Sequence, residues 1–165
     1  MFKIVSLGFL WIAPLALAAL PPLREELRKN WAQVIFDGKV LQIKSEIQTA
    51  PAEPLSHTDR VFTTDVLVSQ VDKGELFAPG DVVQIRYWRP AKRPRGWAGP
   101  QGQNVLPQVG DEGHFYTISM ESEAGILALL EPNGWERTAA CSPQSYLDEI
   151  EWFDPEPVPE GLREL

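Results

Sequence analysis

The sequence predicts a mainly β protein, built as a small five-stranded barrel with a flanking C-terminal helix. Five short segments with alternating apolar side chains are separated by turn residues, which is the pattern of β-strands. The first of these segments is long and contains a glycine, as in a strand that bends around a barrel. With 165 residues, 44% of them hydrophobic, the chain is long enough for one such domain with its own core.

The first twenty residues, MFKIVSLGFLWIAPLALAAL, have the composition of an export signal. Lys3 precedes an apolar stretch, and the small residues Ala16 and Ala18 fit the site that signal peptidase cleaves. We therefore expect residues 1–18 to be a signal peptide and the mature protein to be periplasmic or extracellular. An uncleaved N-terminal membrane anchor is the alternative, although the apolar stretch is short for a spanning helix and contains Pro14.

Residues 19–30 predict a short polar helix or a linker. Glu25 and Glu26 fall in its first turn, and Arg28 and Lys29 fall near its end. This order suits the helix dipole, which favours acids at the N-terminus and bases at the C-terminus.

The first predicted strand, AQVIFDGKVLQIKSEIQ, carries a break at Gly38. Val34 and Phe36 share one face before the glycine, whereas Leu41 and Ile43 carry the apolar face after it. A glycine at which the alternation changes phase predicts a β-bulge and a sharp bend.

The remaining strands complete a barrel that we expect over residues 31–136. HFYTISM and ILALL are the fourth and fifth strands; ILALL also fits a buried helix, but only five residues separate Gly125 from the next turn. The second strand, RVFTTDVLVSQVDKG, and the third, VVQIRYW, each place alternate side chains on one face: Phe62, Thr64, Val66 and Val68, then Val83, Ile85 and Tyr87.

The C-terminal region predicts a helix followed by a tail. Within residues 137–153, Tyr146, Ile150 and Phe153 fall on one stripe, which would dock on the barrel. Residues 154–165 are acidic and proline-rich, and such a segment cannot bury enough apolar surface to order itself.

Five strands, with a bend in the first and a long excursion between the third and fourth, describe a barrel of the oligonucleotide/oligosaccharide-binding (OB) type. A seven- to nine-stranded immunoglobulin-like sandwich is the rival, but the sequence supplies two strands too few.

Three strand-forming segments follow one another along the chain: VIFDGKVLQIKSE, RVFTTDVLVSQVDKGELFAPGDVVQIRYW and VGDEGHFYTISM. From Ala32 to Met120 the chain thereby resembles netrin-like domains, the barrel shared with tissue inhibitors of metalloproteinases. The resemblance implies a secreted module that binds proteins or polysaccharides. Those inhibitors use an N-terminal cysteine and several disulfides, and this chain has one cysteine, Cys141. The resemblance therefore does not imply protease inhibition.

Residues 86–104, RYWRPAKRPRGWAGPQGQN, are predicted to form the long loop between the third and fourth strands, because prolines and glycines interrupt regular structure. The window from Arg86 to Trp97 carries five positive charges and the chain carries −8, so the rest of the chain carries −13. Arginine forks pair with sulfate, carboxylate or phosphate, and tryptophan faces stack on sugars. The predicted ligand-binding residues are Arg86, Trp88, Arg89, Lys92, Arg93, Arg95 and Trp97. The alternative is a structural loop whose arginines pair with the protein's own acids.

Other functional classes find little support. A pI near 4.8 argues against a general nucleic-acid binder, which needs a basic face. A single cysteine excludes an intramolecular disulfide and a cysteine-based zinc cluster. No GxSxG motif is present, a Cys141–His114 pair has nothing to bring it together, and Asp111, Glu112 and His114 are a weak metal motif.

We therefore predict an exported, non-catalytic binding module with no cofactor, whose partner is a protein or an anionic polysaccharide. No nucleic-acid partner is expected, and the membrane is expected only through an uncleaved N-terminal segment. A structural envelope protein with the basic loop paired internally is the second hypothesis, and an enzyme or metalloprotein is the third.

Overall fold

The computed structural model describes residues 21–50, 57–97, 99–120, 125–139 and 151–153. The predicted signal peptide, Cys141 and the predicted tail therefore lie outside the described residues. Among the residues that are described, no helix is long and apolar enough to cross a membrane.

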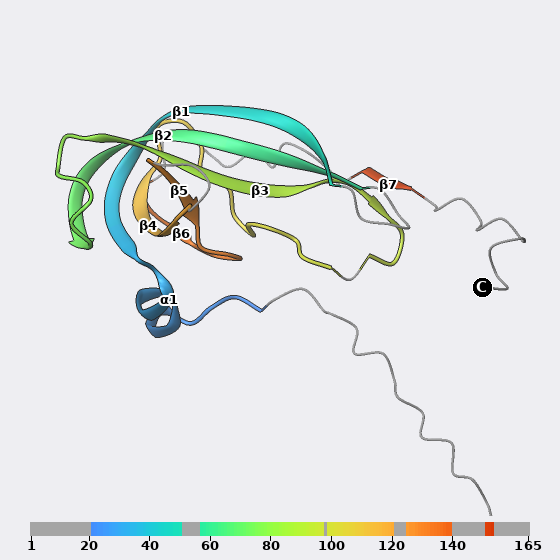
Figure 1. Ribbon diagram of the computed structural model, residues 1–165, viewed down its shortest axis with the longest axis horizontal. Helices are drawn as coiled ribbons and strands as arrows, with labels where there is room; N and C mark the ends of the chain where they lie inside the picture. The colour runs from blue at the N-terminus through green and yellow to red at the C-terminus, as the bar shows by residue number, and fades with distance from the viewer. Residues whose placement is uncertain (1–20, 51–56, 98, 121–124, 140–150, 154–165) are drawn as a thin grey trace, which may run out of the picture.

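The described residues form one short helix and seven strands (Figure 1). The helix lies in the region predicted to be a short helix or linker. The elements in chain order are α1 (Glu25–Trp31), β1 (Val34–Ala50), β2 (His57–Lys73), β3 (Val82–Pro94), β4 (Glu112–Ser119), β5 (Ile126–Leu129), β6 (Trp135–Ala139) and β7 (Glu151–Phe153).

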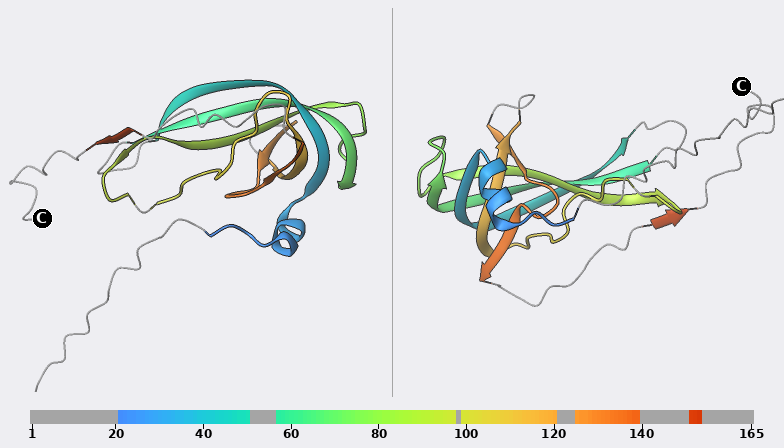
Figure 2. Two further views of the ribbon diagram at one scale, coloured as in Figure 1. Left: turned by 180° about the vertical axis from the view of Figure 1, so that it is seen from behind. Right: turned by 90° about the horizontal axis from the view of Figure 1, so that it is seen from below.

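Five of the strands close into a ring. β1 pairs with both β2 and β4, β2 pairs with β3, and β4 pairs with β5, all antiparallel. A short parallel pairing between β3 and β5 closes the ring, β6 extends it beside β4, and β7 pairs in parallel with the end of β3. The structure thus confirms a mainly β, small barrel-like fold (Figures 1 and 2).

The first three strands continue past the ring as an arm, defined here as residues 45–50, 57–62 and 87–94. Figure 1 shows these long strands running side by side from the barrel to β7, whereas α1 lies at the barrel end. β1 pairs with β4 only over Val34–Lys39, so from Gln42 onward its pairing among the described residues is to β2 alone.

The core contains an aromatic row across β1, β4 and β6. The rings of Phe36 and Phe115 stack with centroids 5.2 Å apart, and the Trp135 ring lies 4.8 Å from that of Phe115. All three side chains are buried, so the row combines a large apolar area with favourable ring contacts. The core-face predictions for β2 and β3 are confirmed, since every residue named for them is buried.

The bend in β1 is real, but its details correct the prediction. Register shifts relative to β2 occur between Ile35 and Phe36, at Asp37/Gly38, and again between Val40 and Gln42. Val40 is buried, whereas Leu41 has no β2 partner and is 43% exposed. The apolar phase therefore changes at Leu41, and Leu41 does not belong to the core face. Gly38 is needed for close approach, because a Cβ there would lie 2.6 Å from Val66 Cγ1.

Three segments differ from the sequence-based expectation. β3 extends to Pro94 rather than ending at Trp88, because Pro90 lies where the β2–β3 register shifts, and a bulge tolerates a residue without an N–H donor. β6 was not predicted. The predicted helix over 137–153 was wrong at both ends, since its first residues belong to β6 and its last three form β7. Residues 140–150 lie outside the described residues.

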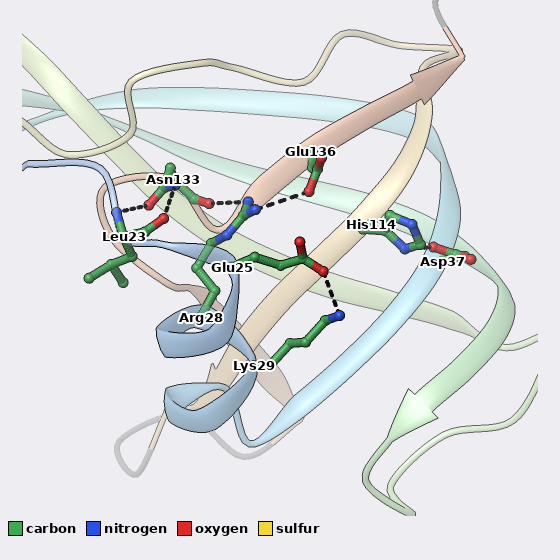
Figure 3. Close-up of polar contacts among 8 residues, drawn as sticks. All are labelled: Leu23, Glu25, Arg28, Lys29, Asp37, His114, Asn133 and Glu136. Atoms are coloured by element: carbon green, nitrogen blue, oxygen red, sulfur yellow. Dashed lines mark hydrogen bonds and ion pairs between the residues drawn. The ribbon is translucent and has the colours of Figure 1, made fainter.

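Helix α1 is fixed to the barrel by Arg28, which is buried (Figure 3). Its guanidinium lies 4.7 Å from the centre of the Tyr116 ring and donates to the Glu136 carboxylate at 3.1 Å and to the Asn133 carbonyl at 3.2 Å. The Asn133 side chain in turn bonds both the N–H and the carbonyl of Leu23.

The C-terminal end of α1 is capped from β2. The Lys73 ammonium donates to the carbonyls of Lys29 at 2.8 Å and Ala32 at 2.6 Å, which suits the negative end of the helix dipole.

Candidate functional site

The basic segment is divided between a strand and a return loop. Arg86 to Pro94 belong to β3. The third strand was predicted to end at Trp88, so the residues from Arg89 to Pro94, predicted as loop, are corrected to strand. Because side chains alternate along a strand, its cations do not all lie on one surface.

Arg93 is an internal residue of the segment, with 1% exposure. Its guanidinium forms an ion pair with Asp59 and donates to the carbonyls of Thr58 at 2.7 Å and Lys92 at 3.0 Å. It also lies 5.9 Å from the ring centre of Trp88 and 5.4 Å from that of Trp97. The prediction that Arg93 contacts a ligand is therefore replaced by a structural role.

The two tryptophans are tied into the same cluster. The Trp88 indole N–H donates to the Glu131 carboxylate at 2.5 Å, and the Trp97 ring lies 4.7 Å from the His57 ring. Burial raises the pKa of the Glu131 carboxyl, the Trp88 hydrogen bond lowers it, and the nearby Asp59 charge raises it. Both tryptophans are half-buried. Arg93, Trp88 and Trp97 are therefore held together by contacts within the chain.

The return loop is also built by internal contacts. Gln103 is buried, and its N–H donates to the Trp88 carbonyl at 3.0 Å. Its side-chain amide donates to the Leu130 carbonyl at 3.0 Å and accepts from the Gly134 N–H at 3.2 Å. Gly102 has a φ of +65°, and a Cβ there would lie 2.1 Å from the Trp88 carbonyl oxygen. The loop is therefore a structural turn that holds β3 near β5.

A second surface brings together cations that the sequence does not group. Arg60 on β2 and Arg89 on β3 are direct cross-strand partners, and Thr58 pairs with Lys92. Residues two apart on a strand share a face, so Arg60, Arg89 and Lys92 lie together, next to the stacked Phe62 and Tyr87 rings. We call Arg60, Arg89 and Lys92 the basic row; all three are half-buried.

Arg60 was missed because it lies 26 positions before Arg86, the first residue of the basic segment. Only the β2–β3 register reveals its place beside Arg89. The available signal was the alternation of β2, which puts Arg60 two residues from the buried Phe62.

The remaining predicted residues lie apart from the basic row. Arg95 is exposed in the turn after β3. Arg86 is half-buried and lines a hollow of about 250 Å³ together with Lys44, Glu46 and Asp65. Because that hollow carries both signs of charge, it is a less selective site for an anion than the basic row.

The weak metal motif Asp111, Glu112 and His114 is not assembled as its spacing suggested. Asp111 is buried, and its carboxylate pairs with Arg137 at 2.5 Å. Glu112 pairs with Lys39 at 3.5 Å. His114 instead lies against Asp37 on β1, with Asp72 of β2 close by (Figure 3 shows His114 and Asp37).

The geometry thus identifies two surfaces: the basic row on the arm and a His–Asp cluster on the barrel. Comparison of the chain with protein-family models, curated proteins and solved structures found no match.

Proposed function

We propose that the protein is an exported, non-catalytic module that binds an anionic glycan through the basic row. The observation that carries the proposal is the cross-strand pairing of Arg60 with Arg89, with Lys92 on the same face. Two guanidinium groups held opposite each other can both donate to one anionic group, and Lys92 adds a third cation on the same face.

The negative charge of the rest of the protein confines an anionic polymer to the basic row. The chain carries a net charge of −8, so an anionic polymer is repelled by the molecule as a whole. A local group of two guanidinium forks and one ammonium offers paired hydrogen bonds to sulfate or carboxylate groups. Attraction limited to the arm would orient the polymer along β2 and β3.

The internal cluster around Arg93 supports this role. The ion pair between Arg93 and Asp59 joins β3 to β2 one residue away from both Lys92 and Arg60. A surface held in place before binding loses less conformational entropy when a ligand arrives. Arg93 is thus proposed to position the basic row, and Trp88 and Trp97 to brace Arg93.

We also propose a relationship to the netrin-like modules that the sequence resembles. Such a relationship, together with the N-terminal segment, points to the same setting: a secreted barrel that meets polysaccharides outside the cytoplasm. Barrels of this type bind oligosaccharides on strand faces and their loops.

Heparin affinity chromatography tests the proposal, with heparin as the model polyanion. We expect the protein to be retained and then released by salt, and we expect the triple variant Arg60→Ser, Arg89→Ser, Lys92→Ser to pass through unretained. The matched control, Arg24→Ser, Lys29→Ser, Lys44→Ser, removes three charges from exposed positions elsewhere and should still be retained.

Absence of retention in the unmodified protein would overturn the proposal. Equal loss in both triple variants would also overturn it, because the attraction would then come from net charge rather than from the basic row. Circular dichroism of each variant should show an unchanged β-sheet spectrum, so that unfolding is not mistaken for lost binding.

A structural envelope protein with an internally paired basic segment is the second candidate. The observation in its favour is β7, which pairs in parallel with β3 at Lys92–Pro94 and makes the acidic residue Glu151 the register partner of Lys92. A chain ending at Ala139 separates the two functions. Internal pairing predicts lower stability of the short chain at low salt that disappears at high salt, whereas equal stability removes this candidate.

A further inference from the structure

A cluster of three potential metal ligands lies on the barrel, away from the basic row. Asp37 comes from β1, Asp72 from β2 and His114 from β4, and their ligand atoms all lie within 4.8 Å of one another. Asp37 and His114 are direct cross-strand partners, so the sheet register itself holds them together.

A β-bulge brings the third ligand to the other two. Ile35 pairs with Lys73 and Phe36 with Val71, so Asp72 is the extra residue between them and has no partner on β1. Bulges redirect side chains and are common beside functional sites. The Gln70 amide donates to the Asp72 carboxylate at 2.6 Å and orients it, as outer-shell partners orient metal ligands.

The Asp37 carboxylate is poorly compensated by the protein. Its Oδ1 atom is shielded from solvent, and apart from the His114 ring no described residue offers it a donor. Asp72 brings a second carboxylate to within 4.8 Å of it. A cation between the two carboxylates would neutralise this excess of negative charge.

We propose that Asp37, Asp72 and His114 bind a divalent transition-metal cation, with Zn²⁺ the preferred ion. An imidazole nitrogen with two carboxylate oxygens suits zinc, whereas Mg²⁺ and Ca²⁺ prefer ligand sets made of oxygen alone. Zinc ligands at about 2.0–2.1 Å in a tetrahedron lie roughly 3.4 Å apart. The three ligand atoms all lie within 4.8 Å of one another, so small side-chain adjustments suffice to surround the ion.

The site can be reached from solvent, because Asp72 is exposed and Asp37 and His114 are half-buried. Asp37 also lines a hollow of about 400 Å³, together with Lys39, Leu67, Ser69, Glu112 and Thr138. Three protein ligands leave a fourth zinc position for water or a small ligand. This site shares no residue with the basic row, so zinc binding can be tested independently of glycan binding.

Isothermal titration of the tag-free protein with zinc chloride tests the site. We expect one Zn²⁺ per chain, and at least about a tenfold loss of affinity in Asp37→Asn and in His114→Gln. His57→Gln is the matched control because the chain has only two histidines, and Glu112→Gln is a second control two residues from His114 on the same strand. Both controls should bind Zn²⁺ as the unmodified protein does.

Nuclear magnetic resonance of the imidazole nitrogens should show that Zn²⁺ shifts the His114 signals and leaves those of His57 in place. No zinc binding at micromolar to submillimolar concentration would overturn the proposal. Equal affinity of His114→Gln and the unmodified protein would overturn it as well, as would stronger binding of Mg²⁺ or Ca²⁺. Asp37→Asn removes one of two neighbouring carboxylate charges, and His114→Gln replaces a half-buried side chain with another polar one, so both variants should fold without metal. Urea unfolding of each metal-free variant verifies this.

Discussion

Arg93 shows that a cation can belong to the inside of a protein even when its neighbours in sequence mark a binding surface. It is 1% exposed, whereas Arg95, two residues later, is exposed. The difference arises from Asp59 and the two tryptophan rings, which together replace the water that a guanidinium loses on burial.

We expect Arg93→Ala to lower the free energy of unfolding by about 3 kcal/mol, because it leaves the Asp59 carboxylate without its partner and a gap between two indole rings. Arg95→Ala is the control and should change stability by no more than about 0.5 kcal/mol. Urea unfolding followed by tryptophan fluorescence measures both. Similar small effects of the two substitutions would contradict the structural role of Arg93.

Glu131 should make stability depend on pH. Its folded-state pKa lies above the ordinary value of 4.5 because of burial, so the folded chain holds the proton at a pH where the unfolded chain has released it. The resulting stabilisation is present below 4.5 and is lost as pH rises through the folded-state pKa.

Glu131→Gln keeps an oxygen acceptor for the Trp88 N–H and removes this titration. We therefore expect the variant to gain stability relative to the unmodified protein as pH rises from about 4 to about 7. Urea unfolding at both values measures the change. An identical pH dependence of the two proteins would show that Glu131 does not titrate differently on folding.

At the scale of strands, the backbone of β4 at Gly113 lies so close to β6 that a side chain there would clash. A Cβ at Gly113 of β4 would lie 2.2 Å from the Glu136 carbonyl oxygen and 2.4 Å from the Trp135 ring, neither of which is free to move. Gly113→Ala should therefore cost about 3 kcal/mol and disturb the pairing of β4 with β6.

Gly125→Ala provides the comparison for this substitution. Nothing lies within 4 Å of a Cβ at Gly125, and its φ of +88° leaves only backbone strain of about 1–2 kcal/mol. Urea unfolding compares the free energies, and near-ultraviolet circular dichroism reports the packing of Trp135. Equal costs for the two substitutions would contradict the predicted clash.

Strand alternation let the sequence predict the inward residues of β2 and β3, because both strands have one buried face and one polar face. It failed where the chain departs from simple alternation. Leu41 was assigned to the core because the phase change was placed at Gly38. β6 was missed because it is five residues long and contains Trp135 as its only large apolar side chain.

The candidate sites were harder to predict than the strands, since both depend on register. Arg60 meets Arg89, and Asp37 meets His114, through pairings between strands that are distant in sequence. Local spacing grouped Asp111 and Glu112 with His114, although these acids pair with Arg137 and Lys39. A single sequence contains the charges but not the pairings that bring them together.

At the scale of the whole molecule, the ring has one weak closure. β3 and β5 pair in parallel over three positions, Gln84 to Arg86, whereas β1 and β2 pair along nearly their whole length. Hydrogen exchange should therefore be faster at the amides of β5 than at those of β1 from Val34 to Val40. Two-dimensional NMR in D₂O measures this, and slow exchange throughout β5 would contradict the expectation.

The part of β1 beyond Gln42 pairs with β2 alone among the described residues, and this has a consequence for association between copies. A strand with one unpaired side is a template on which another chain can add, and proteins commonly protect such edges with charge. Lys44 and Glu46 are exposed on this stretch, with Ile47 exposed beside them. Replacing these two charges with apolar residues would turn the edge into a site of intermolecular β-sheet growth.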